Sequence, residues 1–367
     1  SNKSFSFVDY TKSYDESTGL HLLGDEHKPI STSWSLSYDG LQNFTKTTID
    51  QIYRTDLWDK YARTVLSQST AHSFTSDVNG GGSFGNALPG ADGSWTESEL
   101  ITDYTNSFDD NTRLTENAPI VLIGKSLSFD GVSSDASQKY GYTKSDLYQK
   151  YSDQIWKNSG QTKLEETITR SYTSDKNWNG DYNAPVTDTI DGAYSRSYTT
   201  ASYKDSFDSN GKIIRNANGV PSVTTESWNF DGQHSYTKTI VDQKFNGAVW
   251  ARLGKSQLLE TTSTSFSSDD VVTSYRNDGK VFNKDASIII GQGSYDDPKA
   301  QADRSKNKSV LTTDYSTSFD DVTTKAKQNA GPEAHGSSWS FDGTALNPDN
   351  TNFGFSKSDI YQKFDSD

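Results

Sequence analysis

Cysteine and methionine are both absent from the 367 residues of this sequence. Without cysteine the chain forms no disulfide and supplies no thiolate to a metal ion or a substrate. Because it also lacks an initiating methionine, we expect a processed product or a piece excised from a longer protein. No apolar run approaches the ~20 residues that a transmembrane helix needs, so we expect no membrane insertion.

Aliphatic residues are scarce, and aromatic residues take their place. Hydrophobic residues make up 31% of the chain, against roughly 45–50% in an ordinary soluble domain. The chain has 20 tyrosines, 17 phenylalanines and 8 tryptophans, each of which buries a large area when it is packed. Together with abundant Ser and Thr, this composition favours thin, ordered β-structure over a thick globular core.

Acidic residues outnumber basic ones and give the chain a formal net charge of −14. This charge disfavours nucleic acid and anionic membrane surfaces as partners, because proteins that bind them usually carry basic patches. It favours solubility and leaves cations as candidate ligands.

One short phrase recurs four times along the chain, and three other elements recur with it. The phrase, element B, reads SWSLSYDG at Ser33–Gly40, SLSFDG at Ser126–Gly131, SWNFDG at Ser227–Gly232 and SWSFDG at Ser338–Gly343. Element A precedes it, as in DYTNSFDD. Element C follows, as in YTKS, and element D closes the unit, as in TITRSYTSD. The constant order A-B-C-D predicts a tandem repeat.

The repeat predicts a mainly β fold built from units of about 100 residues, either sandwich-like or solenoid-like, with short helices. Three units are expected at 1–95, 96–190 and 191–300, and an incomplete fourth unit at 301–367. The last unit lacks element D, so we expect a neighbouring copy to cover the unpaired sheet edge. The alternative is that the chain is a fragment of a longer repeat protein.

Elements A and D predict strands, because their apolar residues lie four apart with Ser and Thr between them. Examples are Leu100, Tyr104 and Phe108. Element C predicts a short helix in the first, second and fourth copies, because Ile49, Ile52 and Leu57 follow helical spacing.

The aromatic residues of element B are predicted to form the core of each unit, and the Asp-Gly that follows them to form a turn. The alternative is an aromatic platform that binds sugar. These core candidates are Trp34, Phe129, Trp228, Phe230, Trp339 and Phe341.

Catalytic spacing is missing from the sequence, so we expect no enzyme. The histidines form no HExxH pattern, and there is no nucleophile elbow, phosphate loop or dinucleotide fingerprint. Acidic turns are the only polar chemistry that repeats, and calcium is the one cofactor they suggest, since it binds carboxylate oxygens. Solvated turns are the alternative reading. The candidate calcium ligands are Asp109, Asp110, Asp208, Asp320 and Asp321.

These features together predict a structural protein of the cell exterior, a repeat-built subunit of a surface filament, sheath, layer or adhesin stalk. Its expected partners are copies of itself, and glycans under the alternative interpretation. That alternative is a carbohydrate-binding or polysaccharide-degrading protein on a β-solenoid.

Overall fold

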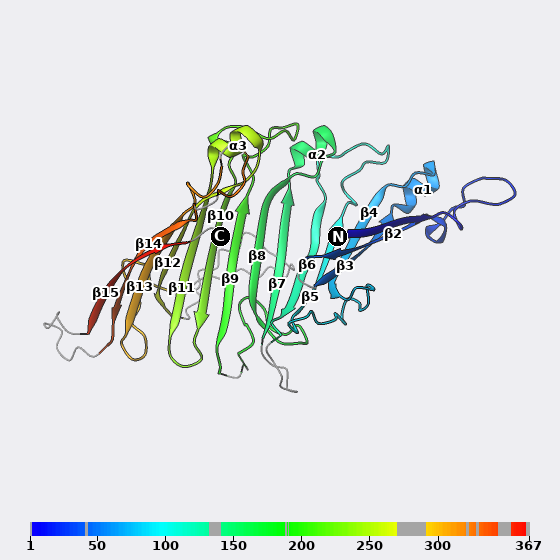
Figure 1. Ribbon diagram of the computed structural model, residues 1–367. Helices are drawn as coiled ribbons and strands as arrows, with labels where there is room; N and C mark the ends of the chain where they lie inside the picture. The colour runs from blue at the N-terminus through cyan, green and yellow to red at the C-terminus, as the bar shows by residue number, and fades with distance from the viewer. Residues whose placement is uncertain are drawn as a thin grey trace. The chain divides into compact units, whose positions relative to one another are not determined.

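The computed structural model describes residues 2–40, 43–131, 141–187, 189, 191–269, 291–320, 323–327, 330–343 and 354–364. Its strands form a 15-stranded antiparallel sheet whose order follows the chain, from β1 to β15 (Figure 1). The predicted mainly β fold is therefore confirmed. In place of a sandwich or a solenoid, the strands form one open meander.

The strands are β1 (Asn2–Asp9), β2 (Ile30–Tyr38), β3 (Phe44–Tyr53), β4 (Leu66–Ser76), β5 (Trp95–Asp103), β6 (Ile120–Phe129), β7 (Tyr142–Tyr151), β8 (Leu164–Ser174), β9 (Tyr194–Ser202), β10 (Ser222–Phe230), β11 (Tyr236–Phe245), β12 (Leu258–Ser268), β13 (Lys306–Asp314), β14 (Glu333–Phe341) and β15 (Phe355–Lys363). The helices are α1 (Thr55–Tyr61), α2 (Asp153–Ser159) and α3 (Gly247–Leu253), and the 3-10 turns are η1 (Asp25–His27) and η2 (Ala217–Gly219).

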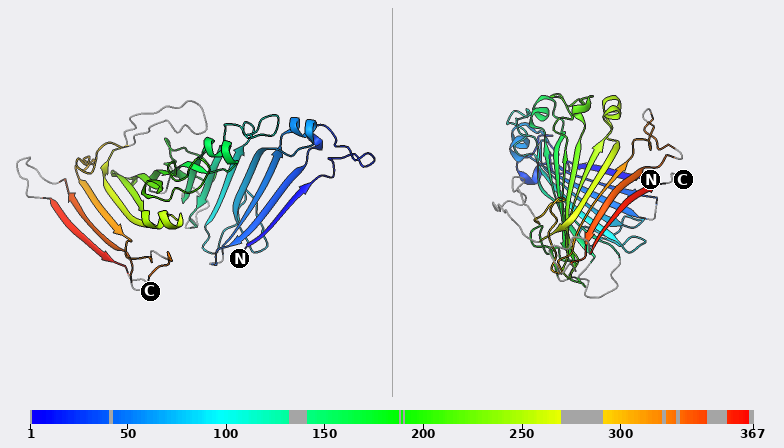
Figure 2. Two further views of the ribbon diagram at one scale, coloured as in Figure 1. Left: turned by 90° about the horizontal axis from the view of Figure 1, so that it is seen from above. Right: turned by 90° about the vertical axis from the view of Figure 1, so that its left-hand side faces the viewer.

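The strands recur in the order of the sequence elements, which the views in Figure 2 also allow the reader to follow. Element B lies in β2, β6, β10 and β14, and element C begins β3, β7, β11 and β15. Element D lies in β4, β8 and β12. Element A spans the end of a strand and the turn that follows it: β5 ends at Asp103, whose carboxylate accepts the backbone N–H of Thr105 at 2.8 Å.

The chain divides into two compact units, whose boundary does not coincide with those of the predicted repeats. One unit consists mainly of residues 1–165 and the other mainly of 166–367, except that the short segments 174–179 and 209–211 belong to the first unit. The repeat boundaries at residues 95, 190 and 300 therefore stay predictions made from the sequence.

The helix prediction for element C was wrong in placement. Phe44–Tyr53 and Tyr142–Tyr151 are strands, and the helices follow them at Thr55–Tyr61 and Asp153–Ser159. The third copy has a helix as well, whereas Phe355–Lys363 of the fourth copy is a strand.

Each helix is fastened to its own part of the sheet by an aliphatic residue and a tryptophan that are both buried. The tryptophan indole N–H donates to a backbone carbonyl in the long connection before element B. Trp58 donates to Leu22 at 2.9 Å, and Trp250 donates to Ile214 at 2.7 Å. This bond satisfies the indole while its ring is removed from water, which is what a buried tryptophan requires.

The Asp-Gly turn after element B requires glycine for two reasons. Gly232 has φ +83°, in the left-handed region, and a Cβ there would clash with the backbone carbonyl oxygen of Asp191. Gly40, in the equivalent turn of the first copy, has φ +96° but has no atom within 4 Å of such a Cβ. Substitutions at these two glycines therefore distinguish the cost of the left-handed backbone conformation from the cost of a steric clash.

We predict that Gly232→Ala destabilises the chain far more than Gly40→Ala does. Gly40→Ala meets only the left-handed penalty of about 1–2 kcal/mol, whereas Gly232→Ala must also displace backbone, for a total of about 3 kcal/mol or more. Urea denaturation of both variants measures the difference. Equal losses would contradict the close approach to Asp191.

Candidate functional site

One face of the sheet carries the charged and aromatic side chains in alternating positions. In the register of the strands, a charged residue on one strand, usually a cation, pairs with an apolar residue on the next. Arg196, for example, pairs with Trp228, which pairs with Lys238. We call this the loop side, because its side chains bond to the loops that join a D strand to the next A strand.

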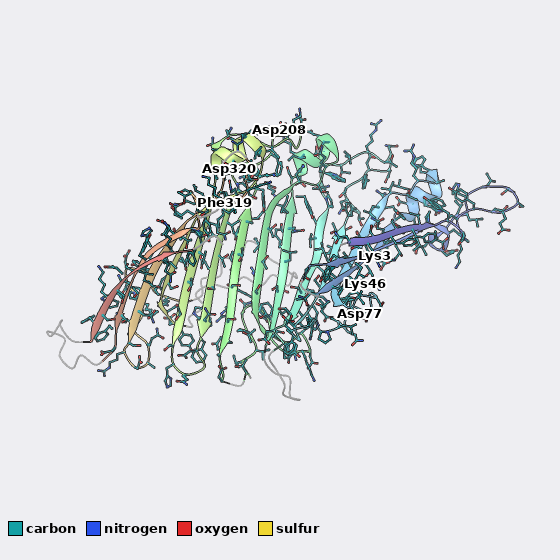
Figure 3. All side chains as sticks on the ribbon, viewed as in Figure 1. Lys3, Lys46, Asp77, Asp208, Phe319 and Asp320 are labelled. Carbon is teal, nitrogen blue, oxygen red and sulfur yellow. The ribbon has the colours of Figure 1, made fainter. Side chains whose placement is uncertain are left out.

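The alternating row contains Lys3, Leu36, Lys46, Phe74, Glu97, Leu127 and Lys144 in the first unit. In the second unit it contains Tyr172, Arg196, Trp228, Lys238, Phe266, Lys308, Trp339 and Lys357. Figure 3 labels two of its lysines, Lys3 and Lys46.

Local contacts hold Arg196 and Lys46, two of the cations of this row. The guanidinium carbon of Arg196 lies 4.3 Å from the ring centre of Trp228, and its Nη1 donates to the carbonyls of Tyr182 and Asn183 at 3.3 and 3.2 Å. The Nζ of Lys46 donates to the carbonyl of Gly80 at 2.8 Å. Such cation–aromatic contacts contribute about 0.5–2 kcal/mol each.

Among the predicted core residues, Trp228 is the most deeply buried, at 2% exposed. It packs with Tyr172 and Tyr182, and Phe230 lies against the same cluster. The other predicted core residues, Trp34, Phe129, Trp339 and Phe341, are half-buried.

The register corrects one alignment within the predicted core. Leu36 and Leu127 pair with Lys46 and Lys144, as Trp228 pairs with Lys238. Trp34 lies two residues earlier on its strand and pairs with Thr48. Leu36, which is 8% exposed, is therefore the counterpart of Trp228. The shared phrase Ser-Trp suggests that Trp34 is equivalent to Trp228 and Trp339, and the register shows that this interpretation is wrong.

A stacked aromatic pair closes every B–C hairpin, which explains why elements B and C both carry an aromatic residue. The ring centres of Phe230 and Tyr236 are 4.5 Å apart, at an interplanar angle of 27°. The pairs in the other copies have centre distances of 4.7–4.8 Å: Tyr38 with Phe44, Phe129 with Tyr142 and Phe341 with Phe355.

Three of the predicted calcium ligands, Asp109, Asp208 and Asp320, lie in separate turns, whose backbone they cap. An oxygen of Asp109 accepts the N–H groups of Asn111 and Arg113, both at 2.8 Å. Asp208 accepts the N–H of Lys212 at 2.9 Å, and Asp320 that of Thr323 at 2.6 Å; both are labelled in Figure 3.

Asp110 instead accepts a hydrogen bond from Arg54 at 3.1 Å, and Asp321 lies outside the described residues. Within the part of the chain that the structure describes, no three His, Asp or Glu residues gather as a metal-binding group. Calcium binding therefore stays a prediction.

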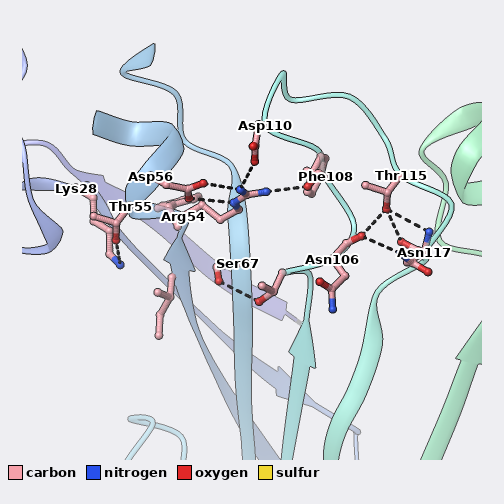
Figure 4. Close-up of a pocket in the computed structure, with 13 residues that line it drawn as sticks. Lys28, Arg54, Thr55, Asp56, Ser67, Asn106, Phe108, Asp110, Thr115 and Asn117 are labelled. Atoms are coloured by element: carbon pink, nitrogen blue, oxygen red, sulfur yellow. Dashed lines mark hydrogen bonds and ion pairs between the residues drawn. The ribbon is translucent and has the colours of Figure 1, made fainter. Parts of the chain in front are cut away.

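A polar hollow in the first unit lies around Arg54 and has a volume of about 780 Å³ (Figure 4). The Arg54 guanidinium lowers the pKa of Asp56 and also donates to Asp110 and to the carbonyl of Phe108. The cation is thus neutralised within the chain. The rest of the lining combines hydroxyl and amide groups, such as those of Thr105 and Asn106, with Lys28, Ile52 and two aromatic residues, Tyr53 and Phe108.

The opposite face of the sheet, which the sequence analysis did not identify, is covered with hydroxyl groups. Its central row has a serine or threonine on every strand. The first unit contributes Ser4, Ser35, Thr47, Ser73, Ser98, Ser126 and Ser145. The second contributes Ser171, Ser197, Ser227, Thr239, Ser265, Ser309, Ser338 and Ser358.

Comparison with known proteins identifies no relative of this chain. No family model matches it, and neither the curated proteins nor the solved structures include a significant match. Among the described helices, none is both long and apolar enough to cross a membrane.

We predict that Trp228→Ala costs about 3–5 kcal/mol of folding stability, as expected when a large buried aromatic side chain is removed. Trp34→Ala is the matched control: it removes the same side chain from a half-buried position, so we expect a clearly smaller loss. Chemical denaturation of the two variants measures both. An unchanged midpoint for Trp228→Ala would place this ring on the surface.

We predict that the Asp231 carboxyl titrates far below an ordinary aspartate. The N–H groups of Ser235 and Gln233 stabilise its charged form and lower its pKa to about 2. Because the folded pKa is depressed, the stabilisation is complete above the unfolded pKa of about 3.9 and is lost as the pH falls through about 2.

NMR titration of the Asp231 carboxyl measures this midpoint directly. The melting-temperature difference between the wild type and Asp231→Asn should be constant above pH 5 and should shrink as the pH falls through the folded pKa. A carboxyl midpoint near 4 would contradict the role of the backbone donors.

Proposed function

We propose that this chain is a structural protein of the cell exterior, a repeat-built subunit of a surface filament, sheath, layer or adhesin stalk. The observation that supports this function is the sheet order, in which each described strand neighbours only the strands before and after it in the chain. Such an array lengthens by adding further hairpins, without changing those already present.

The repeated polar residues support the same function, because they bond to the chain itself. Buried serines at the ends of D strands show this most clearly. Ser76 donates to the carbonyl of Gly81 and Ser174 to that of Asn179, both at 2.7 Å. Residues that recur in this way hold loops in place, as a scaffold requires.

The alternative function, binding or degradation of carbohydrate, draws on the hollow around Arg54. Neutral sugars are held by hydroxyl and amide groups beside an aromatic ring. Tyr53, Phe108, Asn106 and Asn117 line this hollow and provide both kinds of contact. Such a site would not recur in the other copies of the repeat, since Ser152 and Asn246 stand before α2 and α3 where Arg54 stands before α1.

We predict that the protein labels the outer surface of cells that produce it, and that the purified chain assembles into long objects. Immunogold labelling of intact and permeabilised cells tests the location, and negative-stain electron microscopy tests the assembly. Label that appears only after permeabilisation, or a chain that stays dispersed at high concentration, would contradict the structural role.

Electrophoresis in gels that contain neutral polysaccharides tests the alternative. Retardation that is lost in Asn106→Ala, but kept in the exposed control Asn177→Ala, would favour sugar binding in the hollow.

A further inference from the structure

The two faces of the sheet differ completely in charge. The alternating rows of the loop side carry paired ions, such as Lys238 with Glu226 at 2.9 Å and Glu99 with Lys125 at 2.8 Å. On the opposite face, the central row and the rows on either side of it contain no Asp, Glu, Lys or Arg on any described strand. Charged residues make up 23% of the sequence, so this absence is a property of the face. We call these three rows the hydroxyl face.

The row on one side of the central row is also polar and neutral. It contains Asn2, Ser37, Thr45, Thr75, Thr96, Ser128 and Thr143 in the first unit. In the second unit it contains Thr173, Ser195, Asn229, Thr237, Ser267, Asn307, Ser340 and Ser356.

The row on the other side mixes hydroxyl groups with aliphatic side chains. It contains Ser6, Ser33, Ile49, Ala71, Leu100, Gly124 and Leu147 in the first unit. In the second unit it contains Thr169, Thr199, Thr225, Val241, Ser263, Leu311, Gly336 and Ile360.

The central row uses serine where threonine would give the better strand. Threonine carries the same hydroxyl group and has the higher strand preference, yet Thr47 and Thr239 are the only threonines in the row. Most of the central side chains are partly exposed, and hydrogen bonds join some of them across neighbouring strands, as between Thr47 and Ser73 at 2.8 Å and between Thr239 and Ser265 at 2.7 Å. Small side chains leave the backbone open to close approach by another surface.

We propose that the hydroxyl face is a self-association surface, on which the hydroxyl face of a second copy of this chain stacks. Charge is the first reason. Two chains of net charge −14 repel each other, and this face is where they can meet without desolvating an ion. An anionic or cationic partner, by contrast, would find no opposite charge on it.

Periodicity is the second reason for choosing a second copy as the partner. The hydroxyl groups recur at the strand spacing of about 4.8 Å, and the sheet of another copy has the same spacing and the same hand of twist. Each hydroxyl both donates and accepts, so two such faces are complementary to each other. Burial of Ile49, Leu100, Val241 and Leu311 adds an apolar contribution to the contact.

The available area is close to that of a standard contact. The three rows of the hydroxyl face on seven strands, the number in β9–β15, cover about 700 Å² at ordinary strand dimensions. A standard interface between proteins buries about 800 Å² on each partner. The hydroxyl rows of one unit therefore provide most of the area of such an interface.

This inference rests on the proposed structural role in that both require copies to associate, but it specifies which face does so. The test compares two variants, each of which carries three added positive charges on a different surface of the chain. The face variant is Ser197→Lys, Ser227→Lys and Ser265→Lys, and the control variant is Gln233→Lys, Ala302→Lys and Thr317→Lys, at exposed positions off the hydroxyl face. Both changes reduce the negative charge of the chain equally, so general repulsion weakens in both.

Sedimentation equilibrium over a range of concentrations measures the association. We expect the wild type and the control variant to reach at least twice the monomer mass of 40.6 kDa, and the face variant to stay monomeric. Circular dichroism and thermal melting confirm that the face variant is folded. Because the chain has no cysteine, a single Ser227→Cys variant provides a second readout. It should form disulfide-linked dimers faster than Gln233→Cys.

Three outcomes would overturn the stacking proposal. The first is a wild type that stays monomeric, and the second is equal association of the face and control variants. The third is retardation of the wild type, but not of the face variant, in a gel that contains neutral polysaccharide. Electron microscopy separates this failure from failure of the proposed function. Long objects of unchanged width formed by the face variant would leave the structural role standing while removing the stacked face.

Discussion

The register between consecutive strands is the constraint on which the rest of the structure depends. Trp228 meets Arg196 on one side and Lys238 on the other only because three strands are aligned to the residue. A slip by one position would place Ser227 or Asn229 against the loops and would turn the tryptophan to the opposite face. The stacked pair of Phe230 and Tyr236 fixes this register at the end of the hairpin, where the chain reverses.

Loops cover the aromatic side chains of the sheet, whereas in most domains a second layer of secondary structure covers them. The indole N–H of Trp228 donates to the carbonyl of Asp269 at 2.9 Å, and Lys46 donates to Gly80. Loop backbone thus covers the aromatic rings and satisfies the polar ends of the same residues. A core of this kind needs wide, amphipathic side chains more than aliphatic ones, which accounts for a composition rich in Tyr, Phe and Trp.

The sequence predicted the strands and turns where its own periodicity was intact, and failed where the periodicity was broken. Ile49 and Ile52 suggested a helix because a separation of three residues matches helical spacing, yet in the unbroken strand β3 they lie on opposite faces of the sheet. Tyr104 and Phe108 extended the spacing of Leu100 beyond the strand end at Asp103. The equivalence of Leu36 and Trp228 depends on pairing with the next strand, which no pattern within one strand shows.

The hydroxyl face was missed for a related reason, and it explains how the composition is distributed. Within one strand, a serine between two larger residues reads as an ordinary solvent-facing position. Its significance emerges only when the strands of each unit are placed in register and the charged residues are seen to be on one side. The loop side must contain paired ions, because its loops bury them and an unpaired buried charge is costly. The hydroxyl face has no such requirement, so its lack of charge is not explained by the stability of the sheet alone. Solvent exposure does not explain it either, since exposed strands commonly carry lysine and glutamate that keep sheets apart. A neutral, finely spaced surface on an acidic chain is the arrangement that permits contact with a like surface.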